Sequence, residues 1–217
     1  MENQLYHAIV AACEEDLAKH GDTFLGVGWT KKREYAELRY RLMLEGIRPE
    51  IPRPVSVLDF GCGAAHLYEF TVSRQIRGIQ YAGLDLSDKY LSLCRQKHPD
   101  LLFHQIDLLD PAATIPMYDF ILMNGIFTYR GGATHKNMWE YCQRLLLRVF
   151  SFARHGIAFN VMSKHLDWER DDLFHLGFDE LATFLDANVS RHFTIRHDYG
   201  LFEYTTYVYR VPLADFS

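Results

Sequence analysis

The stretch Val57–Leu67, which reads VLDFGCGAAHL, decides the fold of this chain. Its apolar beginning continues a run from Val55 and is typical of a buried strand, whereas its end opens a helical pattern. Two glycines, Gly61 and Gly63, stand between these patterns. Glycine adopts turn conformations that other residues resist, and its missing side chain lets a ligand touch the backbone. The stretch therefore predicts a tight connection from a strand to a helix, with a ligand held at the turn.

Strand-like and helical patterns alternate along the rest of the chain. Such alternation implies parallel strands joined by right-handed crossovers, with helices on both faces of the sheet. The prediction is an α/β fold with a seven-stranded, mostly parallel, doubly wound sheet, an antiparallel C-terminal hairpin and an N-terminal helical extension. We expect strands at 55–60, 79–86, 101–107, 118–125 and 157–163, helices at 64–75, 87–98, 135–156 and 178–187, and hairpin strands at 191–199 and 203–210.

The first 50 residues predict a separate helical part. Two helices are expected at 4–20 and 31–44, and the segment GIRPEIPRP that follows carries three prolines, which end a helix. A length of 217 residues fits one domain with a short appendage. We therefore divide the chain into an N-terminal helical extension or lid at 1–50 and an α/β domain at 51–217.

Charge and composition narrow the class of partner. The formal net charge is -5, whereas a nucleic-acid-binding protein usually presents a basic face, so no nucleic acid is expected. No apolar run approaches the roughly 18 residues of a membrane span, so no membrane partner is expected. The four cysteines lie far apart without zinc-ligand spacing, which predicts free thiols and no metal. With no recognisable secretion signal, the predicted location is the cytoplasm.

Two acidic residues end strands of the predicted sheet. Ligands of such sheets bind beyond the carboxyl ends of the strands, where the strand order reverses. Asp85 at the end of the second strand can accept the hydroxyls of a ribose, and Asp107 at the end of the third can accept the amine of an adenine. Either acid could instead be a helix cap or loop residue. A dinucleotide-binding fold is the nearest alternative, but its G-x-G-x-x-G fingerprint would place a glycine at His66.

At this point a family resemblance emerges. The segments VLDFGCGAAHL, YAGLDLS, FHQIDLLD and YDFILMNGIF resemble successive motifs of the class I S-adenosylmethionine-dependent methyltransferases, specifically over about residues 55–127. Where the family usually has its third glycine, this chain has Ala65, and little loss is expected from that change. The resemblance implies S-adenosyl-L-methionine as cofactor, S-adenosyl-L-homocysteine as product, and a binding site formed by Asp59, Gly61, Cys62, Gly63, Asp85, Leu86, Asp107, Leu108 and Asn124. Asn124 could instead be a turn residue before Gly125.

The segment MNGIFTYRGG after the fourth strand bears on the methyl acceptor. Family members that methylate adenine N6 or glutamine amides carry N-P-P-Y or D-P-P-Y there, so that class is disfavoured. We expect methylation of a small soluble molecule at oxygen, of the natural-product or surface-sugar type. The alternatives are a protein or RNA methyltransferase, a non-catalytic cofactor-binding relative, and an NAD-dependent oxidoreductase. A monomer or homodimer is expected.

Histidines in loops above the sheet are the candidate general bases, because imidazole titrates near neutral pH. His135 and His165 each follow a strand at the ligand-binding edge, whereas His155 is expected at a helix end with a structural role. Contacts with the acceptor are expected from the N-terminal extension and from the loop after the fourth strand. Ordinary packing against the sheet is the alternative for these side chains. The expected acceptor contacts are Trp29, Tyr35, Arg39 and Tyr129.

Overall fold

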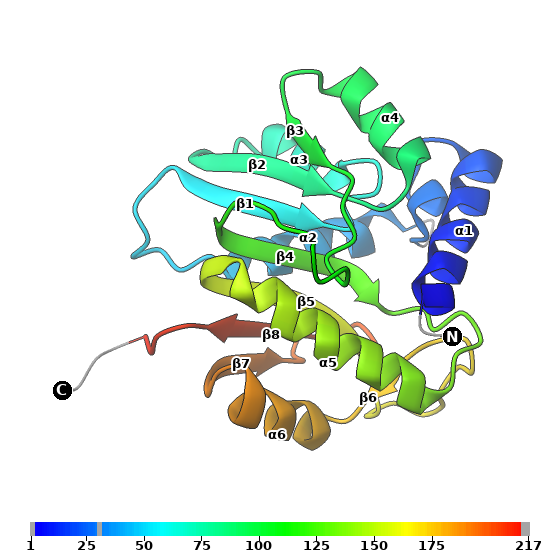
Figure 1. The fold of residues 1–217 in the computed structure, drawn as a ribbon, viewed down its shortest axis with the longest axis vertical. Coiled ribbons are helices and arrows are strands. Elements are labelled where there is room, and N and C mark those ends of the chain that lie inside the picture. The colour runs from blue at the N-terminus through cyan, green and yellow to red at the C-terminus, as the bar shows by residue number, and fades with distance from the viewer. Residues whose placement is uncertain (1–2, 30–31, 214–217) are drawn as a thin grey trace.

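One eight-stranded sheet forms the centre of the fold in the computed structural model, which describes residues 3–29 and 32–213 (Figure 1). The strand order is β3-β2-β1-β4-β5-β8-β7, and the two-residue strand β6 lies beside β5. Pairing is parallel except that β8 runs antiparallel to both of its neighbours. The predicted sheet and hairpin are therefore confirmed, with β6 as an addition. The strands are β1 Val55–Phe60, β2 Ile79–Leu84, β3 Leu102–His104, β4 Tyr118–Phe127, β5 Ala153–Ser163, β6 His175–Leu176, β7 His192–Arg196 and β8 Glu203–Tyr209.

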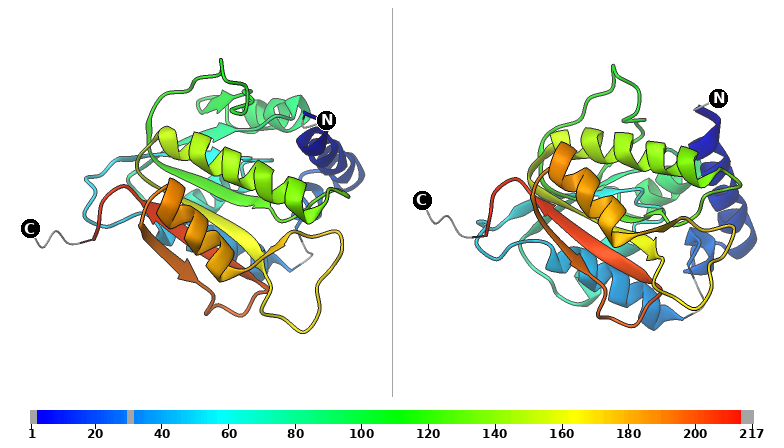
Figure 2. Two further views of the ribbon diagram at one scale, coloured as in Figure 1. Left: turned by 60° about the horizontal axis from the view of Figure 1, so that its bottom comes forward. Right: turned by 90° about the horizontal axis from the view of Figure 1, so that it is seen from below.

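Helices cover both faces of this sheet (Figure 2). On one face, α5 and α6 bury apolar side chains such as Leu146 and Phe184 against Phe127 of β4. On the other face, α2 and α3 bury Tyr40 and Leu67 among the residues of β1 and β4. The helical elements are α1 Asn3–His20, η1 Leu25–Val27, α2 Arg33–Glu45, α3 His66–Ser73, α4 Asp88–Lys97, α5 His135–Ser151 and α6 Phe178–Asn188. Among the described residues, no helix combines the length and the apolar character needed to cross a membrane.

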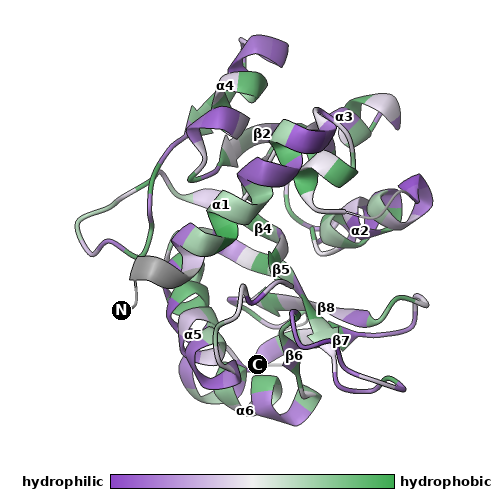
Figure 3. Cartoon of the chain, turned by 90° about the vertical axis from the view of Figure 1, so that its right-hand side faces the viewer, coloured by the Kyte–Doolittle hydropathy of each residue, from purple (hydrophilic) through white to green (hydrophobic). Residues whose placement is uncertain are grey.

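The strand order reverses between β1 and β4, because β1 pairs with β2 on one side and with β4 on the other. This switch point opens a crevice at the carboxyl ends of the two strands. Helix α1 lies across that edge of the sheet, as Figure 3 shows from the side. It is held by Glu14, which accepts a hydrogen bond from the Ser87 hydroxyl at 2.7 Å and pairs with Lys89 at 2.8 Å. The crevice is therefore covered by the chain's own first helix.

The two helices of the first 50 residues have different positions. Helix α1 covers the edge of the sheet, whereas α2 packs on a sheet face and shares a core with β1 and β4. Both predicted helices are present, but the second belongs to the layer that also holds α3. The boundary at residue 50 stays a prediction.

The end of α5 differs from the prediction. The helix ends at Ser151 rather than Gly156, and β5 begins at Ala153. The reason is strand pairing, since Ala153 lies in register with Tyr118 at the start of β4. His155 is therefore a strand residue beside Asp119 at 3.8 Å, and its expected place at a helix end is wrong.

Candidate active site

The tight turn that the sequence predicts after β1 is present in the structure. Gly61 and Gly63 have φ values of +73° and +50°, in the left-handed region that favours glycine. A Cβ atom at Gly61 would lie 2.1 Å from Cδ1 of Ile126, so a side chain there would displace the end of the Ile126 side chain. Ala65, at the position of the family's usual third glycine, also has a positive φ of 61°. A left-handed alanine costs about 1–2 kcal/mol, so this departure carries a strain that was not expected from the sequence.

The Asp85 carboxylate closes this turn from the side of β2. Oδ2 accepts the backbone N–H of Gly63 and Oδ1 accepts that of Ser87, both at 2.9 Å. Burial raises the pKa of Asp85, and the backbone hydrogen bonds oppose that rise. A carboxylate offers about four lone-pair positions, so both oxygens can still accept ligand hydroxyls.

Asp59 at the end of β1 is a buried acid with few partners. Its side chain is 3% exposed, and Oδ2 accepts the Tyr81 hydroxyl at 2.8 Å. Burial raises the pKa of Asp59 to about 7, the Tyr81 hydrogen bond lowers it in part, and the nearby Asp85 raises it further. The Asp59 carboxyl therefore changes its charge near neutral pH, within the cavity that these residues line.

Asp107 lies three residues beyond the end of β3 and is already engaged by α1. Its Oδ2 accepts the Tyr6 hydroxyl at 2.5 Å, and its Oδ1 accepts the backbone N–H of Leu109 at 2.9 Å. Burial and then the hydrogen bond to Asp107 raise the pKa of Tyr6 to about 12, so the phenol keeps its proton. Sequence reasoning missed Tyr6, because the first helix looked like an ordinary amphipathic segment.

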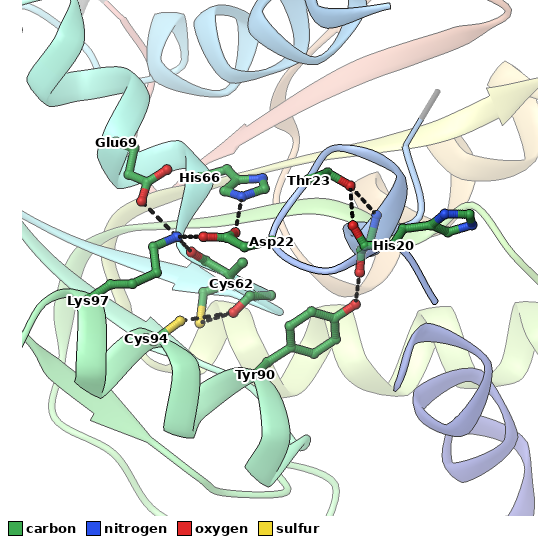
Figure 4. Close-up of polar contacts among 12 residues, drawn as sticks. His20, Asp22, Thr23, Cys62, His66, Glu69, Tyr90, Cys94 and Lys97 are labelled. Atoms are coloured by element: carbon green, nitrogen blue, oxygen red, sulfur yellow. Dashed lines mark hydrogen bonds and ion pairs between the residues drawn. The ribbon is translucent and has the colours of Figure 1, made fainter. Parts of the chain in front are cut away.

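A polar cluster supports the glycine turn from behind (Figure 4). The Lys97 ammonium lies 2.7 Å from both Asp22 and Glu69 and donates to the carbonyl of Ala64 at 3.0 Å. His66 at the start of α3 faces the same Asp22 through Nε2 at 2.7 Å. The cluster ties the turn before η1 to α3 and α4, and it was not foreseen from the sequence.

Two buried thiols lie beside this turn. Cys94 donates to the carbonyl of Gly63 at 3.0 Å, and Cys62 lies 3.8 Å from the same oxygen (Figure 4). The neighbouring Cys94 thiol and burial together hold the pKa of Cys62 well above its usual range. The thiolate form, which reacts as a nucleophile, is therefore suppressed at Cys62.

All the predicted cofactor and acceptor residues line one cavity of about 1000 Å³. The cavity begins at the glycine turn and continues beyond the end of β4 to loops near the C-terminal hairpin. A volume of this size is at the upper end for small-molecule sites, which run from about 300 to 1000 Å³. The predicted residues on its lining are Asp59, Gly61, Cys62, Gly63, Asp85, Leu86, Asp107, Leu108, Asn124, Trp29, Tyr35, Arg39 and Tyr129.

Beyond β4, five residues form one connected unit, here called the outer wall. Arg39 of α2 pairs with Glu203 of β8 through two hydrogen bonds of 2.7 and 2.8 Å. Asn160 of β5 donates to Glu203 at 3.0 Å and accepts the backbone N–H of Gly125 at 2.7 Å. The Arg39 guanidinium lies 4.7 Å from the centre of the Trp29 ring, and a Cβ atom at Gly125 would lie 2.7 Å from that ring. The outer wall thus joins the N-terminal extension to three strands of the sheet.

The two histidines predicted as bases are not brought to the cavity. His135 at the start of α5 lies 3.0 Å from the backbone carbonyl of His175 through Nε2. His165 is exposed and stacks on the ring of Phe178. The role of His135 and His165 in catalysis therefore stays a prediction without geometric support.

A third histidine, His175, does line the cavity, and the sequence analysis missed it. It is buried, and its Nδ1 lies 2.8 Å from the carbonyl of Ser163 while its Nε2 accepts the backbone N–H of Arg170 at 3.2 Å. This pattern requires the neutral tautomer with a proton on Nδ1. His175 therefore holds the loop between β5 and β6 rather than offering a free nitrogen to a ligand.

Three comparisons bear on this geometry. A family model described as a methyltransferase domain matches residues 57–148. The Mycobacterium tuberculosis protein named "Putative methyltransferase Rv1506c" is 25% identical over 157 residues, which cover 71% of this chain and 93% of that protein. The family model falls on the part of the chain that holds the glycine turn and the acids after β2 and β3.

Solved structures share the fold at low identity. A structure described as a DhpI-SAM-HEP complex has a TM-score of 0.61 at 16% identity and covers 94% of this chain and 97% of its own. Magnesium protoporphyrin IX methyltransferase from Synechocystis PCC 6803, solved with bound SAM, has a TM-score of 0.55 at 14% identity and covers 82% of this chain and 79% of its own. Together with the ordered motifs, the family model and the curated relative support a class I S-adenosylmethionine-dependent methyltransferase, and the solved structures show the same fold.

Proposed function

We propose that this enzyme transfers the methyl group of S-adenosyl-L-methionine to an oxygen atom of a small soluble molecule. The observation that carries the proposal is the single cavity that runs from the glycine turn past Gly125 to the loops beside the hairpin. One end has the features of a nucleoside site, and the other end, lined by residues of the outer wall, leaves space for a second ligand. Action in the cytoplasm, as a monomer or homodimer, belongs to the same proposal.

The residues at the inner end fit the cofactor. Gly61 and Gly63 line the cavity in left-handed conformations and without side chains, so a ligand can approach their backbone once the end of the Ile126 side chain moves aside. Asp85 has acceptor capacity left for the two ribose hydroxyls. Asp107 and the backbone of Leu108 would bind the adenine, with Tyr6 of α1 beside them.

The chemistry asks the protein mainly for alignment. Bound S-adenosylmethionine supplies a methyl group already activated by its sulfonium charge. The transfer breaks the carbon–sulfur bond, leaves its electron pair on sulfur, forms a carbon–oxygen bond and releases the hydroxyl proton of the acceptor. Holding two reactants in line is worth up to about 7–11 kcal/mol in favourable model reactions. Helix α1 over the crevice and the outer wall at its far end would hold this geometry and exclude water.

The test uses methyl-labelled S-adenosylmethionine and a cell extract divided into small-molecule, RNA and protein fractions. Label is expected to enter the small-molecule fraction in the presence of the enzyme. In the labelled product, a methoxy group should replace a hydroxyl group of the acceptor. Transfer of label into RNA or protein would replace this proposal by one of those acceptor classes. Calorimetry should show binding of S-adenosylhomocysteine and none of NAD.

A further inference from the structure

Three residues that line the cavity, here together called the floor, each have one buried polar atom without a hydrogen-bond partner among the described residues. These atoms are Nη1 of Arg39, Oδ1 of Asn124 and Oγ1 of Thr128. Asn124 is next to Gly125, on which Trp29 packs, and Thr128 follows the end of β4. A buried polar atom without a partner is unfavourable, so a ligand that satisfies these atoms is bound more tightly than one that does not. The three atoms offer donors from Arg39, an acceptor from Asn124 and a hydroxyl from Thr128.

The charge at this floor is balanced. The Arg39 guanidinium is bound at two points by the carboxylate of Glu203, whose side chain is 1% exposed. A ligand carboxylate placed at Nη1 would be attracted by Arg39 and repelled by Glu203. A ligand ammonium would be attracted by Glu203 and repelled by Arg39. A neutral hydroxyl both donates and accepts, so it suits Asn124 Oδ1 and Arg39 Nη1 without disturbing the pair.

The mouth of the same cavity is apolar and aromatic. Trp168, in the loop between β5 and β6, is 69% exposed, and Phe202, just before β8, is 70% exposed. Both rings line the cavity, together with Tyr129, which is bridged to Leu173. The two loops are tied together where the backbone N–H of Ser163 donates to the carbonyl of Phe202 at 3.0 Å. Large exposed apolar side chains that line a cavity are typical of a ligand-binding groove.

The charged residues at this mouth are Arg170, which is paired with Asp172, and the acid Asp167. Arg170 donates from Nε to Asp172 at 2.9 Å and pairs with the second carboxylate oxygen as well. The mouth therefore has no net positive charge that would attract an anionic ligand. An aromatic ring system that stacks between Trp168 and Phe202 would bury apolar surface on both sides.

We propose that the acceptor is an uncharged aryl alcohol or phenol, with its hydroxyl on the floor formed by Arg39, Asn124 and Thr128 and its ring system between Trp168 and Phe202. This inference rests on the proposed methyl transfer to a small molecule and names its acceptor class. Sugars, which carry many hydroxyls and no flat apolar body, and aryl carboxylates are the competing classes that the test separates.

The experiment is calorimetry on the enzyme saturated with S-adenosylhomocysteine. The probes are 2-naphthol, 2-naphthoate, which has the same rings with a carboxylate, and methyl α-glucopyranoside, which has hydroxyls without an aromatic ring. The expected result is that 2-naphthol binds at least about tenfold more tightly than either other probe, a difference equal to about 1.4 kcal/mol. Equal or tighter binding of 2-naphthoate or the glucoside overturns the proposal, and so does the failure of 2-naphthol to bind.

Two variants test whether 2-naphthol binds at the proposed position. Trp168→Ala and Phe202→Ala each remove an exposed ring and should weaken 2-naphthol binding about three- to tenfold, the value of one aromatic contact, with little change in the binding of S-adenosylhomocysteine. Val72→Ala is the matched control, because Val72 is 58% exposed on α3 and does not line the cavity. Unchanged 2-naphthol binding in both ring variants overturns the proposal. If the wild type fails to bind S-adenosylhomocysteine, the methyl-transfer function itself fails, whereas cofactor binding without 2-naphthol binding removes only the acceptor class.

Discussion

Arg39 of α2 and Glu203 of β8 are 164 residues apart in sequence and form a two-point ion pair, with Nε to Oε1 at 2.7 Å and Nη2 to Oε2 at 2.8 Å. The two side chains are only 11% and 1% exposed. A pair with this geometry joins the first and last thirds of the chain at the acceptor side of the cavity. It also means that Arg39, expected from the sequence to contact the acceptor, offers the ligand only the nitrogen that Glu203 leaves unbonded.

Arg39→Met should destabilise the protein strongly. It leaves the Glu203 carboxylate buried without its partner, and breaking a buried ion pair in this way costs about 3–5 kcal/mol. Urea unfolding monitored by circular dichroism measures the change. Arg33→Met is the control, since Arg33 is 70% exposed in its pair with Glu37, and such a pair contributes about 0–1 kcal/mol. Similar losses in the two variants would contradict the structural role of the buried pair.

Asp85→Ala should weaken cofactor binding. The change removes hydrogen bonds to a charged acceptor, which are worth about 1.5–3 kcal/mol each, and it frees the N–H of Gly63 in the glycine turn. We expect the Kd for S-adenosylhomocysteine to rise about ten- to a hundredfold in calorimetry. Asp88→Ala removes an exposed acid three residues away and should leave the Kd unchanged. An equal effect of both changes would show that general charge, rather than the position of Asp85, governs binding.

Asp59→Asn should change how stability depends on pH. Burial raises the pKa of Asp59 to about 7, while an unfolded aspartate titrates near 3.9. Between these values the folded protein holds a proton that the unfolded chain has lost, so the free energy of unfolding falls as the pH rises from about 4 to about 7. The amide of the variant would still accept the Tyr81 hydroxyl but would carry no charge.

The gain in stability of this variant over the wild type should therefore grow from pH 4 to pH 8, on the order of 2–4 kcal/mol. Urea titrations at pH 4, 6 and 8 measure it. Because the cofactor is cationic, the wild type should also bind S-adenosylmethionine more tightly as Asp59 ionises, and the variant should lose that dependence. If the difference in stability between the variant and the wild type does not vary with pH, the raised pKa of Asp59 is contradicted.

Replacing His135 or His165 by alanine should leave turnover nearly unchanged. Neither side chain lines the cavity, and each is engaged elsewhere, His135 with a backbone carbonyl and His165 with an aromatic ring. Loss of a general base would instead lower kcat about 10²- to 10⁴-fold. Steady-state kinetics with an identified acceptor decide between these outcomes. A loss of that size in either variant, with cofactor affinity intact, would restore the sequence-based assignment of a base.

The inner half of the site was predictable because its signals are local. The pattern VLDFGCGAAHL combines a strand, a turn and a helix within eleven residues, and acids just after the next two strands come to the same sheet edge by topology alone. Every residue assigned to the cofactor by this reasoning lines the cavity. The boundary of α5 was less predictable, because the residues before Gly156 suit a helix as well as a strand, and pairing with β4 decides the matter.

The outer half depends on contacts between distant segments, which a single sequence does not reveal. Glu203 opens a β-rich run and Asn160 interrupts an apolar one, so each was detectable as a polar residue in a buried strand. No pattern in the sequence indicates that Arg39 pairs with Glu203, the residue to which Asn160 also donates. In the same way Tyr6 could not be matched with Asp107, 101 residues further along the chain.

The position of β8 has a consequence for the order of synthesis. This strand lies between β5 and β7, and Glu203 at its start is the residue on which Arg39 and Asn160 both converge. A ribosome makes Arg39 and the glycine turn early, so the emerging polypeptide can form its nucleoside-binding half long before Glu203 leaves the exit tunnel. Until then Arg39 has no counter-charge from Glu203 and the outer wall is open. The outer wall can therefore close only after Glu203 has been synthesised.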